Sequence, residues 1–484
     1  MGSGSRRPAA VRTLSPLAGL SRRSLGEREV TAQSLGTTAP AAAMSSVPAI
    51  VAAQAGNATM YSFVVATVVI VLVSFCINEF SRRMAASGSL YSFVARGLGP
   101  VPALTCGAAL IVGYGVLAMA TLVLASTYVS ALLPGTPGAP VAVAVMLALA
   151  IAAAIIMIRS VSLSSRAMLV IELAAICAVV VVIAVLVIHS RAPIASPFVR
   201  PTGVSAGGFG AGVALAITAF IGFESAAALG PEARRPHRTV GRAIRRTVAG
   251  AAILYLVASW VELSEFPGGA RGLAATVTPL PDLAARTAGW LPPILDLAIA
   301  ASAFACATAS ATALTRLLFS MARERLVSRS LGRTSRRFRT PHVAVLATWV
   351  VVALVPTCLI AFGLGPNDAF VSLVTIATFG YMLAYILVCA ALPWFLLQIG
   401  ELTRPALAAG LVAVLVLVAT FALYAWPSGR TDRLLLLLAC AAVAAGTAWL
   451  ATRVRRRPDD PTRIGLYDEP IASDLLGTAA RRAS

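Results

Sequence analysis

The chain has 484 residues, of which 58% are hydrophobic and 12% are charged, and its formal net charge is +20. A soluble domain usually carries about a quarter charged residues, so this composition excludes an ordinary soluble protein and favours a chain of membrane spans. The positive charge does not indicate nucleic-acid binding, because the basic residues form short patches between apolar runs, where they orient helices. All 39 basic residues are arginine, which excludes lysine-based chemistry.

The seven cysteines lie singly within apolar runs. No CxxC pair and no Cys/His spacing of a metal site occurs, so the sequence predicts neither a zinc site nor a disulfide framework. We therefore expect no metal and no cofactor, and we interpret the cysteines as small helix-packing residues.

Apolar runs recur through most of the chain, each close to the ~20 residues that are needed to cross a bilayer. They predict twelve transmembrane helices near residues 33–54, 58–79, 101–133, 139–158, 167–189, 207–229, 247–264, 291–320, 342–364, 368–394, 405–426 and 433–452. The flanking residues 1–30 and 456–484 are polar, and we expect both to be disordered tails. The transporter domain is then residues 31–455.

Arginine is concentrated in alternate connections between these runs. Because cytoplasmic loops carry the excess of positive charge, this pattern places both termini in the cytoplasm. The sequence thus predicts a multi-pass protein of the cytoplasmic membrane. Four charged residues in the predicted cytoplasmic segments are expected to form salt bridges that hold an inward gate shut: Glu79, Arg82, Arg238 and Arg323.

The most informative stretch is residues 220–244, FIGFESAAALGPEARRPHRTVGRAI. It places Glu224 directly after an apolar run that is long enough to enter a bilayer, and ionisable groups at that depth usually mark a pathway. Gly222 weakens the helix, and Gly230 with Pro231 ends it. Glu224 is a candidate gating or proton-carrying group. The alternative is a structural acceptor for the N–H groups of a broken helix.

Three segments, in this order, resemble motifs of the amino acid–polyamine–organocation permease family. Residues 78–100 (NEFSRRMAASGSLYSFVARGLGP) are similar to the family's loop after the second span. Residues 222–224 (GFE), with Glu232 and residues 242–244 (RAI), resemble its sixth span. Residues 310–341, which contain FSMAR, resemble the loop after its eighth span. The resemblance covers roughly residues 30–455.

The resemblance implies an all-α membrane fold with two inverted five-helix repeats, about residues 33–190 and 205–395, and two further helices at 405–452. Spans 1 and 6 of such a fold are discontinuous, and the substrate binds near the midplane where they break. A broken helix exposes N–H groups on one half and carbonyl groups on the other, which suits the two charges of a zwitterionic amino acid.

We expect the first break within residues 36–46 and the second at residues 220–224. The first lacks the Gly-small-Gly triplet of many family members. For the aromatic candidates, ordinary packing is the alternative to a substrate contact. The residues expected to bind substrate are Thr38, Ala39, Pro40, Ala41, Phe220, Ile221, Gly222, Phe223 and Tyr114.

Glu172, in the predicted fifth span, matches a position that holds lysine in some family members. It is either a second protonatable group or a partner of Arg166 near the membrane surface. Ser302 and Thr308 resemble the hydroxyls of a cation site in this fold. The alternative is that they bond to their own helix, as hydroxyls in membrane helices often do.

Together these features predict a secondary active transporter of an amino acid or related amine, working by alternating access. No GxxxxGK[ST] motif for ATP and no HExxH or GxSxG motif for hydrolysis occurs, which argues against an ATP-driven pump and against an enzyme. Two candidate membrane carboxylates favour proton symport, and substrate exchange is the alternative. A transporter-like sensor that does not transport is the alternative from another class. The expected partners are the substrate, H⁺ and the bilayer.

Overall fold

The computed structural model describes residues 20–135, 138–159, 161–189, 198, 203–335, 337–425, 430–456 and 464–468. In these residues the chain forms seventeen α-helices and three short 3₁₀ helices, and it has no strand apart from one bridge between Leu25 and Ala233. The expectation of an all-α protein is therefore confirmed.

Ten helices are long, and prolines fall within the first two positions of several of them, where a missing N–H costs no hydrogen bond. They are α4 (Thr59–Ser81), α6 (Pro100–Ala131), α7 (Ala139–Arg159), α8 (Val161–His189), α10 (Pro236–Glu265), α13 (Leu291–Arg323), α14 (His342–Ala361), α15 (Pro366–Gln398), α16 (Arg404–Ala425) and α17 (Arg430–Arg455).

The other elements are short and lie at interruptions or at the ends of the bundle. They are α1 (Glu27–Thr38), α2 (Pro40–Met44), α3 (Val47–Ala55), η1 (Gly56–Ala58), α5 (Leu90–Leu98), α9 (Ala206–Thr218), η2 (Phe223–Glu232), α11 (Ala270–Ala274), α12 (Pro279–Thr287) and η3 (Arg329–Gly332).

Eleven of the described segments are long and apolar enough to cross a membrane, whereas the sequence predicted twelve. The difference lies in the first predicted span, residues 33–54. There the chain is divided among three short helices. The last of them, α3, forms one continuous apolar segment with α4, Val47–Ser81. Length and composition thus support eleven of the predicted spans.

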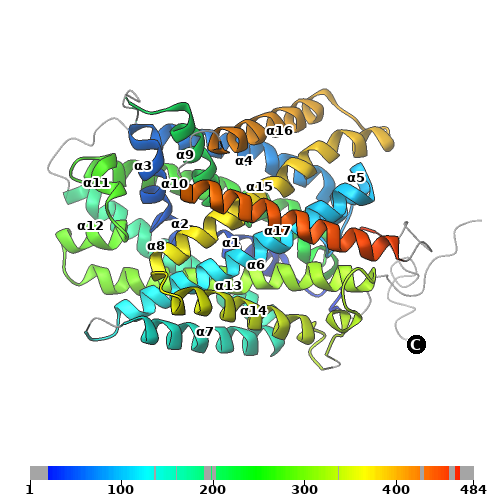
Figure 1. Cartoon of the computed structure of the whole chain (residues 1–484), viewed down its shortest axis with the longest axis horizontal. Helices are drawn as coiled ribbons and strands as arrows, with labels where there is room; N and C mark the ends of the chain where they lie inside the picture. The colour runs from blue at the N-terminus through cyan, green and yellow to red at the C-terminus, as the bar shows by residue number, and fades with distance from the viewer. Residues whose placement is uncertain are drawn as a thin grey trace, which may run out of the picture.

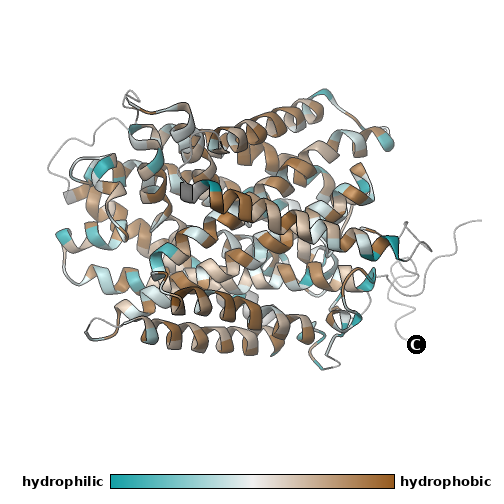
Figure 2. Cartoon of the chain, in the orientation of Figure 1, coloured by the Kyte–Doolittle hydropathy of each residue, from teal (hydrophilic) through white to brown (hydrophobic). Residues whose placement is uncertain are grey.

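The helices form one elongated bundle in which α6 lies inside and packs against both α13 and α15 (Figure 1). Helices α7 and α14 pack together along one side, and α16 lies on the opposite side. The outer helices carry many exposed apolar side chains and are brown along their length in Figure 2. An exposed apolar surface of this extent fits contact with lipid.

The two ends of the bundle differ in the elements they contain (Figure 1). We call one the α5 end: it holds α5, the last turn of α13, residues 20–25 and residues 464–468. The opposite end holds α11 and α12, and we call it the α11 end.

Parts of both expected tails are packed against the bundle. Leu25 N donates to Glu232 O at 2.9 Å, and Arg234 N donates to Leu25 O at 2.9 Å, so residues 20–25 lie beside the end of η2. At the other terminus, Asp468 N donates to Ala85 O at 2.7 Å. The expectation of disorder therefore differs from the structure at residues 20–30 and 464–468.

Candidate functional site

The first interruption follows α1. Ala39 has φ 44° and ψ 62°, a left-handed conformation that is costly for a residue with a Cβ, and α2 begins at Pro40. Pro40 has no N–H to donate back into the preceding turn, so the helical hydrogen bonding cannot run through it. Within the same stretch, a further break at Ser45 and Ser46 separates α2 from α3. Both lie inside the stretch in which the sequence predicted a break.

The second interruption lies between α9 and η2, and it touches the first. Gly222 has φ 97°, which glycine adopts without strain. A Cβ at this position would overlap the Thr37 Cγ2 atom and lie 2.9 Å from the Thr37 carbonyl oxygen. Only glycine therefore fits here, and its missing side chain lets the two interruptions approach each other.

Glu224 is completely buried beside Gly222 and accepts three hydrogen bonds. Tyr114 Oη donates to Oε1 at 2.9 Å, Tyr385 Oη donates to Oε2 at 2.6 Å, and Gly222 N donates to Oε2 at 3.1 Å. The carboxylate thus ties η2 to α6 and α15. This is the geometry of the structural acceptor that the sequence left as the alternative, and Tyr385 is a partner that the sequence did not reveal.

The aromatic candidates pack against other rings. Phe220 meets Tyr255 edge-on with ring centroids 4.7 Å apart, and Phe223 lies 5.7 Å from the Tyr385 ring. Tyr114 also packs edge-on against Tyr381, at 5.3 Å. These contacts agree with the packing alternative for all three candidates.

A set of short polar side chains joins the two interruptions. Ser34 Oγ donates to the Phe223 carbonyl at 2.6 Å, and the Thr37 and Ser225 hydroxyls lie 2.8 Å apart. Ser225 Oγ also donates to Gln33 O at 3.1 Å. These hydrogen bonds tie α1 to the start of η2, and the sequence reasoning did not identify these residues.

Glu172, on α8, is also completely buried, and its side chain lies beside the start of α2. Ser302 Oγ donates to its Oε1 atom at 2.9 Å, and Ala41 N lies 3.4 Å from the same atom. Its Oε2 atom has no hydrogen-bond partner among the described residues. One oxygen of Glu172 is therefore held while the other is not.

Of the two alternatives for Glu172, the pairing with Arg166 is not the one that the structure has. Arg166 Nε instead donates to Glu29 Oε1 at 2.8 Å. Residues 166 and 172 are six positions apart on α8, and side chains with that spacing point to different faces of a helix. Glu172 therefore faces the interior of the bundle and Arg166 does not.

The two hydroxyls expected to share a cation site do not act together. Ser302 bonds to Glu172 and accepts from Ala42 N at 3.2 Å. Thr308 instead donates to Phe304 O of its own helix at 2.7 Å. In the described part of the chain, no group of three or more His, Cys, Asp or Glu side chains could hold a metal ion.

A small cavity of about 40 Å³ lies between the interruptions. Of the nine residues expected to bind substrate, Thr38, Ala39 and Ile221 line it, and the other six do not. Neither Glu224 nor Glu172 is among its lining residues. The rest of the wall comes from Thr37, Ala42, Ala43, Val47, Leu117, Thr121, Leu124, Thr218, Cys306, Phe370 and Val374.

A second, larger hollow of about 520 Å³ opens at the α11 end. Gln54, Asn367 and Asp368 contribute polar groups to its wall. Phe370 lines both this hollow and the small cavity. Phe370 therefore lies between the large hollow and the small cavity.

The α5 end carries a layer of ion pairs below the interruptions. Arg316 Nε lies 3.1 Å from Glu232 Oε1, and both side chains are at most 2% exposed. This pair joins α13 to the end of η2. Both residues lie within the family-like motifs, but nothing in those motifs indicated that they meet.

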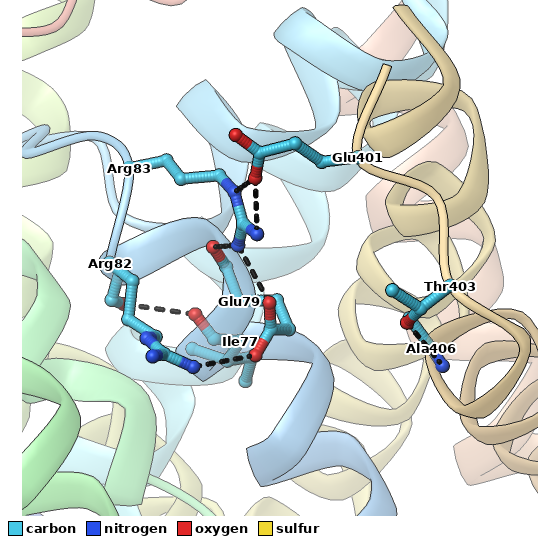
Figure 3. Close-up of polar contacts among 8 residues, drawn as sticks. Ile77, Glu79, Arg82, Arg83, Glu401, Thr403 and Ala406 are labelled. Carbon is cyan, nitrogen blue, oxygen red and sulfur yellow. Dashed lines mark hydrogen bonds and ion pairs between the residues drawn. The ribbon is translucent and has the colours of Figure 1, made fainter. Parts of the chain in front are cut away.

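Of the four residues expected to form salt bridges at this end, Glu79 and Arg82 pair with each other. Figure 3 shows Glu79 between Arg82, whose Nη1 lies 3.3 Å from Oε1, and Arg83, whose Nη1 lies 2.6 Å from Oε2. Arg83 also reaches Glu401, with an Nη2–Oε2 distance of 2.7 Å. Among the described ion pairs, none joins Glu79 to Arg238 or Arg323. The network instead joins α4 to the residues after α15.

The sequence profile of the amino acid permease family matches residues 30–443, which is most of the chain. The chain belongs to the amino acid permease family. With its eleven apolar segments, this membership makes it a multi-pass membrane protein and an amino acid transporter.

Individual relatives are also permeases or transporters. The chain is 26% identical over 358 residues to the branched-chain amino acid permease BcaP of Bacillus subtilis, which covers 70% of this chain and 74% of the relative. It is 25% identical to the methylthioribose transporter of the same organism, over 63% of this chain and 68% of the relative. An uncharacterized transporter of Mycobacterium tuberculosis is 33% identical, over 28% of this chain and 30% of the relative.

Proposed function

We propose that this permease carries a neutral amino acid across the cytoplasmic membrane by alternating access, with the substrate held between the two interruptions. The observation that carries the proposal is the small cavity between Thr38, Ala39 and Ile221, which has no charged side chain in its described wall. A buried charge needs a partner, so a cationic or anionic side chain would be poorly served there.

The arrangement of the chain supports this placement. One interruption precedes α3 and the other follows α9, so each falls at the start of one proposed repeat, about residues 33–190 and 205–395. We assign α1–α3 as the first span and α9–η2 as the sixth, each discontinuous. The arginine-rich α5 end then faces the cytoplasm with both termini.

The cavity as it stands is smaller than an amino acid. A water needs about 10–15 Å³ by this measure, so about 40 Å³ holds roughly three waters. Substrate binding therefore requires the walls to move apart. The movable part is the contact between the interruptions, because hydroxyl and carbonyl groups hold it rather than a continuous helix.

We further propose proton symport with Glu172 as the proton carrier and Glu224 as a brace. Glu224 accepts three hydrogen bonds that together hold both of its oxygens, so a proton on either oxygen has to be placed beside an existing donor. Glu172 can take a proton on Oε2 and keep the bond from Ser302 to Oε1. A buried carboxyl with a spare oxygen is the better carrier of the two.

Purified protein in proteoliposomes tests the transport proposal. We expect a pH gradient, acidic outside, to drive uptake of alanine, valine or leucine into vesicles that contain no substrate, and to leave arginine and glutamate outside. Leucine and valine are tested first, because one relative is a branched-chain amino acid permease. Uptake of arginine or glutamate in preference to these would contradict the neutral-substrate proposal. Strict dependence on internal substrate would replace symport by exchange.

Glu172→Gln and Glu224→Gln form a matched pair for the coupling role. Glutamine at 172 keeps the side-chain shape but cannot carry a proton, so we expect it to abolish uphill uptake and retain counterflow exchange. Glutamine at 224 replaces one acceptor oxygen by a donor facing a tyrosine, so we expect both activities to fall. Retained uphill uptake in Glu172→Gln would remove Glu172 from the coupling step.

A further inference from the structure

Residues 464–468 (IGLYD) lie across the α5 end and bond to three separate elements. Asp468 N donates to Ala85 O at 2.7 Å, just after α4. Leu466 N donates to Glu324 Oε1 at 2.8 Å, at the end of α13. The Ser92 hydroxyl of α5 donates to Leu466 O at 3.2 Å. The segment is thus fixed by its own backbone groups.

The side chains of the segment are packed as well. Leu466 contacts a small apolar cluster formed by Leu20 and Phe319. The Arg96 guanidinium lies over the Tyr467 ring, 5.2 Å from its centroid. Gly465 has φ 79°, and a Cβ there would overlap Ala95, so the chain runs against α5 with no room for a larger residue.

An ion pair joins the segment to the N-terminal residues. Arg22 Nε lies 2.9 Å from Asp468 Oδ1 and 3.0 Å from Oδ2. The residue after it, Arg23, donates its backbone N–H to Pro231 O at 3.1 Å, at the end of η2. The C-terminal segment is therefore connected through Arg22 to the discontinuous sixth span.

These contacts bridge two sets of elements at the α5 end. On one side are residues 20–25, which lead into α1 and pair with the end of η2. On the other side are α5 and the end of α13, joined by the hydrogen bond from the Tyr91 hydroxyl to Glu324. A path that opens between α1, η2 and α13 must move these two sides apart.

We propose that residues 464–468 act as a latch that holds the α5 end closed, and that transport requires the latch to leave its site. The proposal rests on the proposed function only in taking the α5 end as the side where substrate leaves. The latch is a segment of the chain itself, so deletion or weakening of its contacts favours the state that is open at this end and raises the rate of substrate release.

Leu466→Asp is the main test, with Leu402→Asp, at an exposed leucine just after α15, as a matched control. Asp at 466 puts a charge into the apolar contact with Leu20 and Phe319. We expect counterflow exchange in proteoliposomes to rise about tenfold in Leu466→Asp, since the variant loses the apolar contact of a half-buried leucine and places a charge in the same contact. The control keeps the wild-type rate. An unchanged or lower rate in Leu466→Asp would overturn the latch.

A charge swap gives a second test that does not depend on packing. Asp468→Arg and Arg22→Asp each break the pair, and we expect each to raise the exchange rate about two- to fivefold, the range for partly exposed ion pairs. The double variant restores a pair of reversed polarity and should return to the wild-type rate. Additive increases in the double variant would contradict a direct role for the pair.

Hydrogen exchange separates this proposal from the transport proposal. The Leu466 and Asp468 amides donate hydrogen bonds, so they should be protected in the wild type and lose protection in Leu466→Asp. This readout needs no substrate. Protected amides in a protein that transports no amino acid would reject the proposed function and keep the docked segment, whereas unprotected amides in the wild type would reject the latch.

Discussion

The two ends of this permease are closed in different ways. At the α5 end, ion pairs and backbone contacts join α1, α4, α5, α13, η2 and the C-terminal residues. At the α11 end, a hollow of about 520 Å³ reaches inward as far as Phe370, which also lines the small cavity. One end is held by a layer of specific contacts, and the other is separated from the cavity by a thin wall.

This difference indicates where the free-energy cost of opening is located. Opening the α5 end requires many polar groups to lose their partners, and buried polar groups without partners are costly. Opening the α11 end requires the wall at Phe370 to move, with the loss of apolar contacts. We therefore expect the ion pairs at the α5 end to oppose opening on that side. Substitutions can weaken the contacts at either end separately.

The largest effect is expected from Glu232→Ala. It leaves the Arg316 guanidinium buried without its partner, and breaking a buried pair in this way costs about 3–5 kcal/mol. We expect a large fall in the melting temperature of the detergent-solubilised protein. The double variant Glu232→Leu with Arg316→Met removes both charges and should recover most of the loss. Equal melting temperatures for the single variant and the wild type would mean that this pair does not hold the α5 end.

A pH dependence is expected at the same end through Glu324. Burial raises the pKa of Glu324 from 4.5 to about 7, although hydrogen bonds from Tyr91 and from Leu466 N act to lower it. Tyr91 faces Glu324 from α5, and burial raises the pKa of its hydroxyl well above the usual value, so it stays neutral. Beyond the interface, Arg22 and Asp468 form their own ion pair.

The raised pKa of Glu324 determines the direction in which docking changes with pH. The stabilisation that protonated Glu324 gives to the docked segment is complete below about pH 4.5 and is lost as pH rises through about 7. We expect the protection of the Leu466 amide, corrected for the intrinsic exchange rate, to fall between pH 5 and pH 8. Glu324→Gln should remove this dependence. Protection that increases with pH would contradict the assignment.

A smaller effect is expected at the α11 end from Phe370→Ala. Removing the ring joins the small cavity to the large hollow, so bound substrate is less enclosed. We expect the affinity for the transported amino acid, measured by thermal shift titration, to fall about tenfold, which corresponds to about 1.4 kcal/mol. Phe362→Ala is the control, because Phe362 is 91% exposed. An equal loss in both variants would contradict a specific role for Phe370.

The smallest effects are expected in the network of Figure 3, where Arg82 and Arg83 form a matched pair. The Arg83 side chain is 25% exposed and bridges Glu79 and Glu401, whereas the Arg82 side chain is 62% exposed and meets Glu79 alone in this network. We expect Arg83→Ala to cost about 0.5–1 kcal/mol of stability and Arg82→Ala less than about 0.5 kcal/mol. A larger loss for Arg82→Ala in a denaturation series would contradict this ranking.

The sequence located features that depend on local chemistry. Pro40 and Gly222 change the backbone wherever they occur, so the two interruptions could be predicted to within a few residues. Glu224 was identified because a carboxylate is rare within an apolar run. The all-α class followed from hydropathy alone.

Features that depend on packing could not be located in this way. Tyr385, Thr121 and Phe370 lie on long apolar helices, where the residues that face a cavity have the same composition as those that face another helix. The ion pairs were misassigned for a related reason. Several arginines lie near each carboxylate at the α5 end, so composition could not show that Glu79 meets Arg83 while Glu232 meets Arg316.

Cys306 lines the small cavity, so thiol labelling can probe access to it. Its thiol donates to the Thr37 carbonyl at 2.9 Å, and it is the cysteine among the described lining residues. A small mercurial or methanethiosulfonate reagent that enters the cavity would modify this residue, and a bound amino acid would protect it. With the exposed Cys177 and Cys440 and the partly exposed Cys358 replaced by serine, the rate of Cys306 labelling from each side of the membrane would report which end is open.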